Sequence, residues 1–142
     1  HSSGRQLGRS EITSTSQVTG AVFGDGTNPL ILPGVVVNGT RPIVAKFAAA
    51  LLTNGTAGGH AIARIQRRLS GGAYVTIGSA YVYAPVANGG APGARDIPMG
   101  VLAAGTYDFK IQLAAGVAGQ VATLWCDAGT AFGPASLRVV EE

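Results

Sequence analysis

Acidic residues, a histidine and a cysteine are the side chains of this sequence whose chemistry suits catalysis or metal binding. No two acidic residues stand at a spacing that indicates a paired general acid and base. His60 belongs to no His-x-His or Glu-x-x-His pattern, and no Gly-x-Ser-x-Gly motif offers it a nucleophile. The carboxylates are those of Glu11, Asp25, Asp96, Asp108, Asp127, Glu141 and Glu142. The sequence therefore predicts no enzyme, no cofactor and no metal site, and it places His60 at the start of a strand.

Cys126 is the single cysteine, so a disulfide within the chain is excluded. It follows Trp125 in an apolar run, where a buried and unreactive thiol is the usual outcome. Core packing is the role predicted for Trp125.

Two loop motifs have both a functional and a structural interpretation. Asp25-Gly26-Thr27-Asn28 offers oxygen ligands for calcium, but it lacks the remaining acids of an EF-hand loop, which favours an ordinary turn. The sequences beginning at Asn38 and Asn54 match the N-glycosylation pattern, and the turn preference of Asn-Gly explains them equally well.

Strands must position all of these residues. The 22 glycines and 7 prolines separate short runs rich in Val, Ile, Thr, Tyr and Phe, a rhythm typical of a sandwich. In residues 106–113, Tyr107, Phe109, Ile111 and Leu113 alternate with polar residues, so one face of this strand is predicted to enter a core. We predict an all-β fold, an antiparallel jelly-roll-like β-sandwich of about eight strands.

The other segments are assigned by the same rules. Residues 45–52 are alanine-rich, but Pro42 and the Asn54-Gly55 turn bound them tightly, which favours a strand over a helix. Residues 88–93, with three glycines and a proline, are predicted to form the longest loop. The remaining predicted strands are residues 11–19, 30–37, 42–48, 60–69, 74–77, 80–86, 120–126 and 136–141.

Composition limits the partners of the domain. Residues 1–5 resemble the remnant of a purification tag, which leaves residues 6–142 as one domain. Only 12% of the residues are charged against 46% apolar, so part of the surface is predicted to be covered by a partner or by copies of the chain. The net charge is +3, and in a strand Arg64 and Arg68 share one face while Arg67 takes the other. This split disfavours nucleic-acid binding, and no apolar run is long enough to insert into a membrane.

Four segments resemble the distal domain of certain tailed-phage minor tail proteins. They are Leu7-Gly8-Arg9-Ser10-Glu11-Ile12-Thr13, the stretch from Pro33 to Val44, Gly105-Thr106-Tyr107-Asp108-Phe109-Lys110-Ile111-Gln112, and the ending from Ala135 to Glu141. The resemblance implies a β-sandwich head at the tip of a tail fibre or minor tail protein. Such heads assemble as homotrimers in the virion and recognise the host surface, often its carbohydrate. The resemblance transfers no receptor-binding residues.

The receptor contact is therefore predicted from the residues. The segment around residues 87–96 contributes Arg95 and Asp96, and Tyr83 lies close before it, so these three residues are the predicted receptor-binding site. Tyr81, Tyr83 and Trp125 are further candidates for stacking on sugar rings. Three alternatives remain open: a capsid decoration protein, a tail-associated depolymerase, and a cellular trimeric binding domain of the TNF or C1q type.

Overall fold

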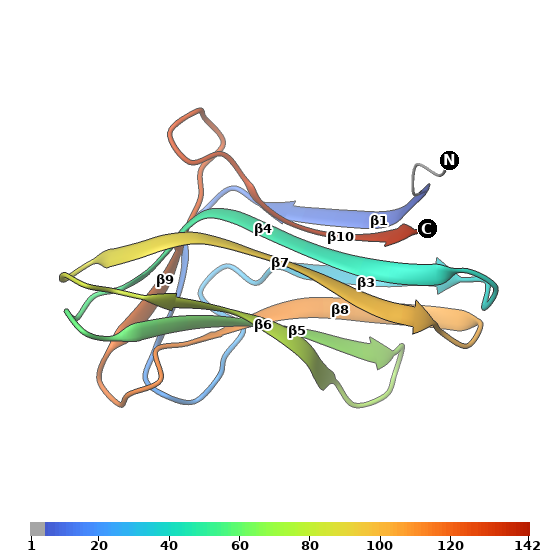
Figure 1. The fold of residues 1–142 in the computed structure, drawn as a ribbon, viewed down its shortest axis with the longest axis horizontal. Coiled ribbons are helices and arrows are strands. Elements are labelled where there is room, and N and C mark those ends of the chain that lie inside the picture. The colour runs from blue at the N-terminus through green and yellow to red at the C-terminus, as the bar shows by residue number, and fades with distance from the viewer. Residues whose placement is uncertain (1–4) are drawn as a thin grey trace.

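The computed structural model describes residues 5–142, which form ten antiparallel strands in two facing sheets (Figure 1). No helix long and apolar enough to cross a membrane occurs in this range. The strands are β1 (Arg5–Ile12), β2 (Ser16–Thr19), β3 (Ile31–Val37), β4 (Pro42–Asn54), β5 (His60–Leu69), β6 (Val75–Tyr83), β7 (Gly89–Val101), β8 (Gly105–Ala114), β9 (Val121–Trp125) and β10 (Ala135–Glu141).

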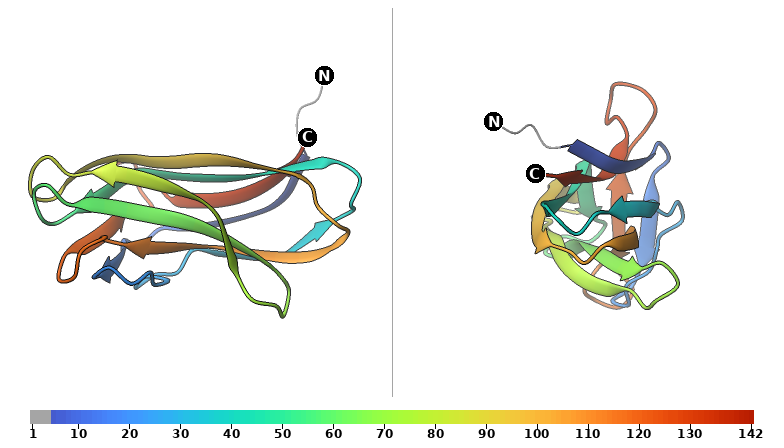
Figure 2. Two further views of the ribbon diagram at one scale, coloured as in Figure 1. Left: turned by 60° about the horizontal axis from the view of Figure 1, so that its bottom comes forward. Right: turned by 90° about the vertical axis from the view of Figure 1, so that its right-hand side faces the viewer.

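Pairing of the strands is nested in the manner of a jelly roll. β5 pairs with β6, β4 with β7, β3 with β8 and β1 with β10, so each pair encloses the one before it. Sheet A runs β1-β10-β4-β7, and β9 and β2 continue it beside the second half of β4; sheet B runs β3-β8-β5-β6. The end-on view in Figure 2 shows the two layers facing each other across the core. The predicted jelly-roll-like β-sandwich is confirmed, with ten strands instead of about eight.

The core lies between the sheets and follows the period-2 alternation of the strands. Tyr107, Phe109, Ile111 and Leu113 of β8 are all buried, as predicted. They face a second set of buried side chains from sheet A, which consists of Ile43, Ala45, Phe47, Leu52, Leu124, Leu137 and Val139. Residues 45–52 belong to the continuous strand β4, so the strand prediction for them is confirmed.

The predicted loop over residues 88–93 is wrong, because Gly89–Val101 is a strand, β7. A methyl group at Gly90 would lie 1.9 Å from the Leu52 carbonyl oxygen of β4, so this glycine permits close approach of two backbones. β7 hydrogen-bonds to β4 alone, and an edge strand of this kind tolerates proline. The glycines and prolines of this segment usually indicate a loop, but here they belong to an edge strand that packs closely against β4.

Other boundaries also differ from prediction. The strands predicted over residues 74–77 and 80–86 are joined in one strand, β6, which spans Val75–Tyr83 and has an irregular pairing register opposite Ile65 and Gln66 of β5. Residues 11–19 are divided between β1 and β2. Arg5, assigned to the tag remnant from the sequence, begins β1 and pairs with Glu141, whereas residues 1–4 lie outside the described range.

Candidate carbohydrate-binding surface

Three aromatic rings gather on the outer face of sheet B, where β5 begins and β6 ends. His60 pairs with Tyr83 across the two strands, and Tyr81 projects from the same face of β6. The His60 ring lies 4.8 Å from the Tyr81 ring and 5.4 Å from the Tyr83 ring, centroid to centroid. Tyr81 and Tyr83 are 61% and 54% exposed. This tyrosine patch presents aromatic surface to solvent without a covering segment.

A buried amide holds the neighbouring loops in place. Asn54, at the end of β4, is fully buried, and its Nδ2 donates to the carbonyl of His60 at 2.8 Å and to Oε1 of Gln120 at 2.9 Å. Its Oδ1 accepts from the backbone N–H of Thr56 at 2.8 Å. These bonds fix the chain just before the patch. They also remove Asn54 from consideration as a glycosylation acceptor, whereas Asn38 is exposed.

Arg64 stands next to the tyrosine patch on the same face. Its Nε donates to Oε1 of Gln112 on β8 at 2.9 Å, and its guanidinium lies 4.1 Å above the ring of Phe23. Gln112 in turn donates from Nε2 to Oδ1 of Asp25 at 2.9 Å, so the segment between β2 and β3 is tied to the sheet. The result is a polar row that begins where the aromatic rings end.

Asp108 is the centre of a second polar cluster on this face. It accepts from the N–H of Gly34 at 3.0 Å, from Ser70 Oγ at 2.9 Å and from Arg68 Nε at 2.9 Å. The Gly34 amide is the largest cause that lowers the pKa of Asp108, and Arg68 and Ser70 add to it against the opposing effect of burial. Arg68 also lies 4.5 Å from the ring of Tyr74. Both carboxylate oxygens accept hydrogen bonds from the fold, so this cluster is structural and braces β3, β5 and β8.

The three residues predicted as a receptor site do not lie together. Tyr83 belongs to the tyrosine patch on the outer face of sheet B. Asp96 lies on the outer face of sheet A, 3.3 Å from Nζ of Lys46. Arg95, between them on β7, donates to the backbone carbonyl of Ser79 at 2.9 Å and so bridges the adjacent edges of the two sheets. Only Tyr83 shares a surface with other exposed aromatic residues.

Trp125 does not pack in the core, which corrects the prediction. It pairs with Leu51 and points away from the buried Leu124, so it lies on the outer face of sheet A. Its Nε1 donates to Thr53 Oγ1 at 2.8 Å, and Phe132 lies 5.9 Å from it, ring centroid to ring centroid. Cys126, one residue later, is buried as predicted, and burial raises the pKa of its thiol.

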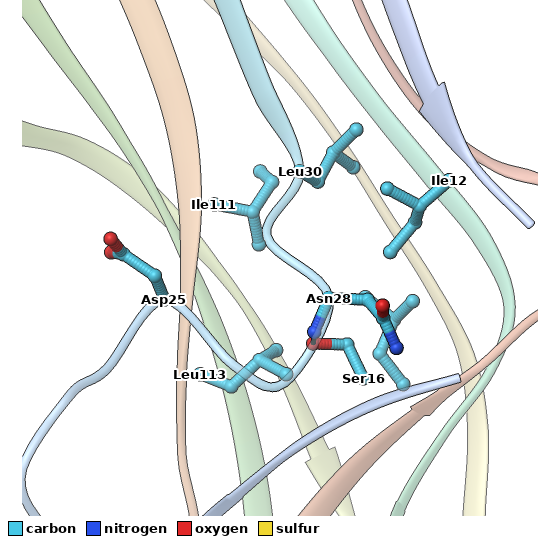
Figure 3. Close-up of a pocket in the computed structure, with 8 residues that line it drawn as sticks. Ile12, Ser16, Asp25, Asn28, Leu30, Ile111 and Leu113 are labelled. Carbon is cyan, nitrogen blue, oxygen red and sulfur yellow. Dashed lines mark hydrogen bonds between the residues drawn. The ribbon is translucent and has the colours of Figure 1, made fainter. Parts of the chain in front are cut away.

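The loop around Asp25 is tied to sheet B, since the Asp25 carboxylate lies 3.0 Å from Nζ of Lys110. Figure 3 shows a small cavity beneath it, lined by Ile12, Leu30, Ile111 and Leu113, with the Asp25 carboxylate directed away from the other side chains. Its volume is about 10 Å³, room for about one water molecule. The side-chain Nδ2 of Asn28 donates a hydrogen bond to the carbonyl oxygen of Thr15 at 2.7 Å. Throughout residues 5–142, no three His, Cys, Asp or Glu side chains gather as metal ligands would.

No protein-family model matches the sequence, and no curated protein matches it either. The site is therefore defined by geometry alone. Sequence reasoning found Tyr81 and Tyr83 as candidate sugar platforms, but it missed that His60, Arg64 and Phe23 join the same surface. The available signal was the alternation of Tyr81 and Tyr83 across Val82, together with the shared face of Arg64 and Arg68.

Proposed function

We propose that this domain is a non-catalytic attachment head of a phage virion, at the tip of a tail fibre or minor tail protein, which binds host-surface carbohydrate as a homotrimer. The observation that carries the binding proposal is the tyrosine patch, where two tyrosine rings are more than half exposed beside His60. Aromatic rings with polar neighbours suit the apolar faces and hydroxyl groups of sugars. The resemblance of four segments to phage minor tail proteins supports the virion context.

Homotrimer formation is supported by the outer face of sheet A. There Ala94, Ala48 and Ser136 lie in one row across β7, β4 and β10. Small side chains at these three positions allow another subunit to approach closely. The row ends at Glu11 of β1, and the neighbouring row of the same face, formed by Asp96, Lys46, Arg138 and Arg9, is charged, so the expected contact is confined to the small residues. Three copies would present three tyrosine patches, and multivalency would convert weak sugar contacts into firm attachment.

Binding to host cells and to a carbohydrate array tests the function. The double variant Tyr81→Ala/Tyr83→Ala should lose most of the binding, on the order of tenfold or more once multivalency is included. Val75→Ala is the matched control, since Val75 is also exposed on β6 but lies at its other end. The single variants Arg95→Ala and Asp96→Ala should bind as the native protein does.

Each outcome bears on a separate part of the proposal. Unchanged binding by the tyrosine double variant would remove the patch as the site. Loss of binding in Arg95→Ala or Asp96→Ala would move the contact to the edge near β7. Failure of the native protein to bind cells or sugars would overturn the attachment function, and binding to purified capsids would then favour a decoration protein.

A further inference from the structure

Arg64 differs from the other cations on the outer face of sheet B. Arg68 is paired with Asp108 at 2.9 Å, and Lys110 with Asp25 at 3.0 Å. In the described part of the chain, no carboxylate lies within ion-pair distance of Arg64. Of the three cations Arg64, Arg68 and Lys110, Arg64 is therefore the one whose charge no acidic side chain balances. It is also the one next to the tyrosine patch.

The guanidinium of Arg64 is fixed in place but not fully used. Gln112 Oε1 accepts from Nε and Nη2, and the plane rests over Phe23. A guanidinium has five N–H donors in a planar fork, so the donors on its other edge remain for a ligand. A side chain held in this way loses little entropy on binding, which is what preorganisation of a binding site requires.

Position links Arg64 to the exposed ring of Tyr81. Tyr81 pairs with Ile62, two residues before Arg64 on the same face of β5. Diagonal neighbours of this kind are about 7–8 Å apart at their backbones, within reach of long side chains. The Arg64 guanidinium itself is held toward Gln112 on β8, on the other side of β5 from Tyr81. A sugar ring that stacks on Tyr81 must therefore extend a substituent across β5 to reach it.

We propose that Tyr81 and Arg64 form one subsite for an acidic sugar, whose apolar ring face stacks on Tyr81 and whose carboxylate binds the free edge of Arg64. The planar fork of arginine matches a carboxylate in two-point hydrogen bonding. The His60 ring lies 4.8 Å from the Tyr81 ring, centroid to centroid, and packs against one side of it. This inference rests on the proposed carbohydrate-binding function and names the class of sugar that the site selects.

The test compares an oligogalacturonate with its methyl ester, because the two share a ring and differ in charge. The native chain should bind the acid roughly tenfold more tightly, a factor in the range of one charge-assisted contact. Arg64→Gln should abolish this preference while keeping the weak binding of the ester, and Tyr81→Ala should weaken both. Arg64→Lys should keep only part of the preference. A phosphate-bearing sugar distinguishes selection of carboxylate from selection of any anion.

Arg41→Gln is the matched control, because it removes one positive charge as Arg64→Gln does. Arg41 lies just before β4, whereas the end of β4 near the tyrosine patch is Asn54. It should leave the preference intact, and thermal unfolding of each variant checks that it is folded. An unchanged preference in Arg64→Gln, or equal binding of acid and ester by the native chain, would overturn the acidic-sugar subsite and leave carbohydrate binding standing. Tighter binding of the phosphate-bearing sugar would overturn the choice of carboxylate. Absence of binding to every sugar would overturn both proposals.

Discussion

The two outer faces of the sandwich belong to a six-stranded sheet A and a four-stranded sheet B, and they carry different side chains. On sheet B, the row across β8, β5 and β6 reads Gln112, Arg64 and Ser79, and beyond it lie the tyrosines. On sheet A, the row across β7, β4 and β10 reads Ala94, Ala48 and Ser136, all small. The face of sheet B presents exposed aromatic rings beside a polar row, whereas the face of sheet A carries a row of small side chains next to a charged row formed by Asp96, Lys46, Arg138 and Arg9.

Charges are also arranged differently on the two faces. The Asp108 carboxylate of sheet B is only 9% exposed and accepts hydrogen bonds from three strand or turn segments. The Asp96 carboxylate of sheet A is 64% exposed and contacts Lys46 alone. Acidic residues of the same type thus hold the fold together on one face and are solvated on the other. The bonds of Asp108 hold this part of sheet B rigid. Burying the solvated Asp96 would cost free energy, so a subunit contact on sheet A is expected to lie over the small residues and to leave Asp96 in water.

The largest effect is expected from filling the small-residue row. Ala48→Arg places a long charged side chain between Ala94 and Ser136, at an exposed position that the isolated domain tolerates. If this face is the trimer contact, the mass in solution should fall from about three times 14.2 kDa to the mass of one chain. Light scattering coupled to size-exclusion chromatography measures it.

Ala73→Arg is the control for that substitution, since Ala73 is exposed in the turn between β5 and β6, on the other sheet. It should leave the mass unchanged. A trimer that survives Ala48→Arg places the contact elsewhere, and a native monomer removes the assembly from the proposed function.

The next effect concerns the two aspartates. Asp108→Ala leaves Arg68 and the Gly34 amide without their acceptor, and it should lower the free energy of unfolding by about 2–3 kcal/mol. Asp96→Ala removes an exposed ion pair and should cost about 0–1 kcal/mol. Urea denaturation of both variants measures the difference. An equal decrease in the free energy of unfolding for both variants would mean that the two aspartates contribute equally to stability.

The sequence predicts most of the fold because alternation of apolar residues is a local signal. β5 is predicted with the bounds that the structure shows, and the buried residues of β8 are identified individually. β7 could not be found in this way. Its glycines and prolines are explained by close pairing with β4 at a sheet edge, a contact between segments far apart in sequence.

The candidate site was harder to predict, because it depends on strand register. Continuing the pairing of Arg67 with Val75 along the hairpin would place His60 opposite Val82 and turn the tyrosines toward the core. The irregular register between Ile65 and Gln66 shifts the strands by one residue, so that His60 faces Tyr83. No residue pattern announces this shift. Trp125 was assigned to the core because Leu124 and Cys126, its neighbours in sequence, are apolar; both are buried on the inner face, and Trp125 between them points outward.

The smallest predicted effect is the dependence of the Asp108 contribution on pH. Because the pKa of Asp108 is lowered in the folded state, chiefly by the Gly34 amide, its charged form contributes stability that is fully present above the unfolded value of about 3.9 and is lost as the pH falls through the folded pKa.

Asp108→Asn keeps the shape and removes the titration. Its deficit relative to the native protein, about 1–2 kcal/mol at pH 7, should therefore shrink below about pH 4. Urea denaturation at a series of pH values measures it, with Asp96→Asn as the control for removal of an exposed carboxylate, expected to cost about 0–1 kcal/mol at pH 7. A deficit for Asp108→Asn that stays constant into acid would mean that the carboxylate contributes through shape and not through charge, and the contrast between the two faces would then reduce to packing.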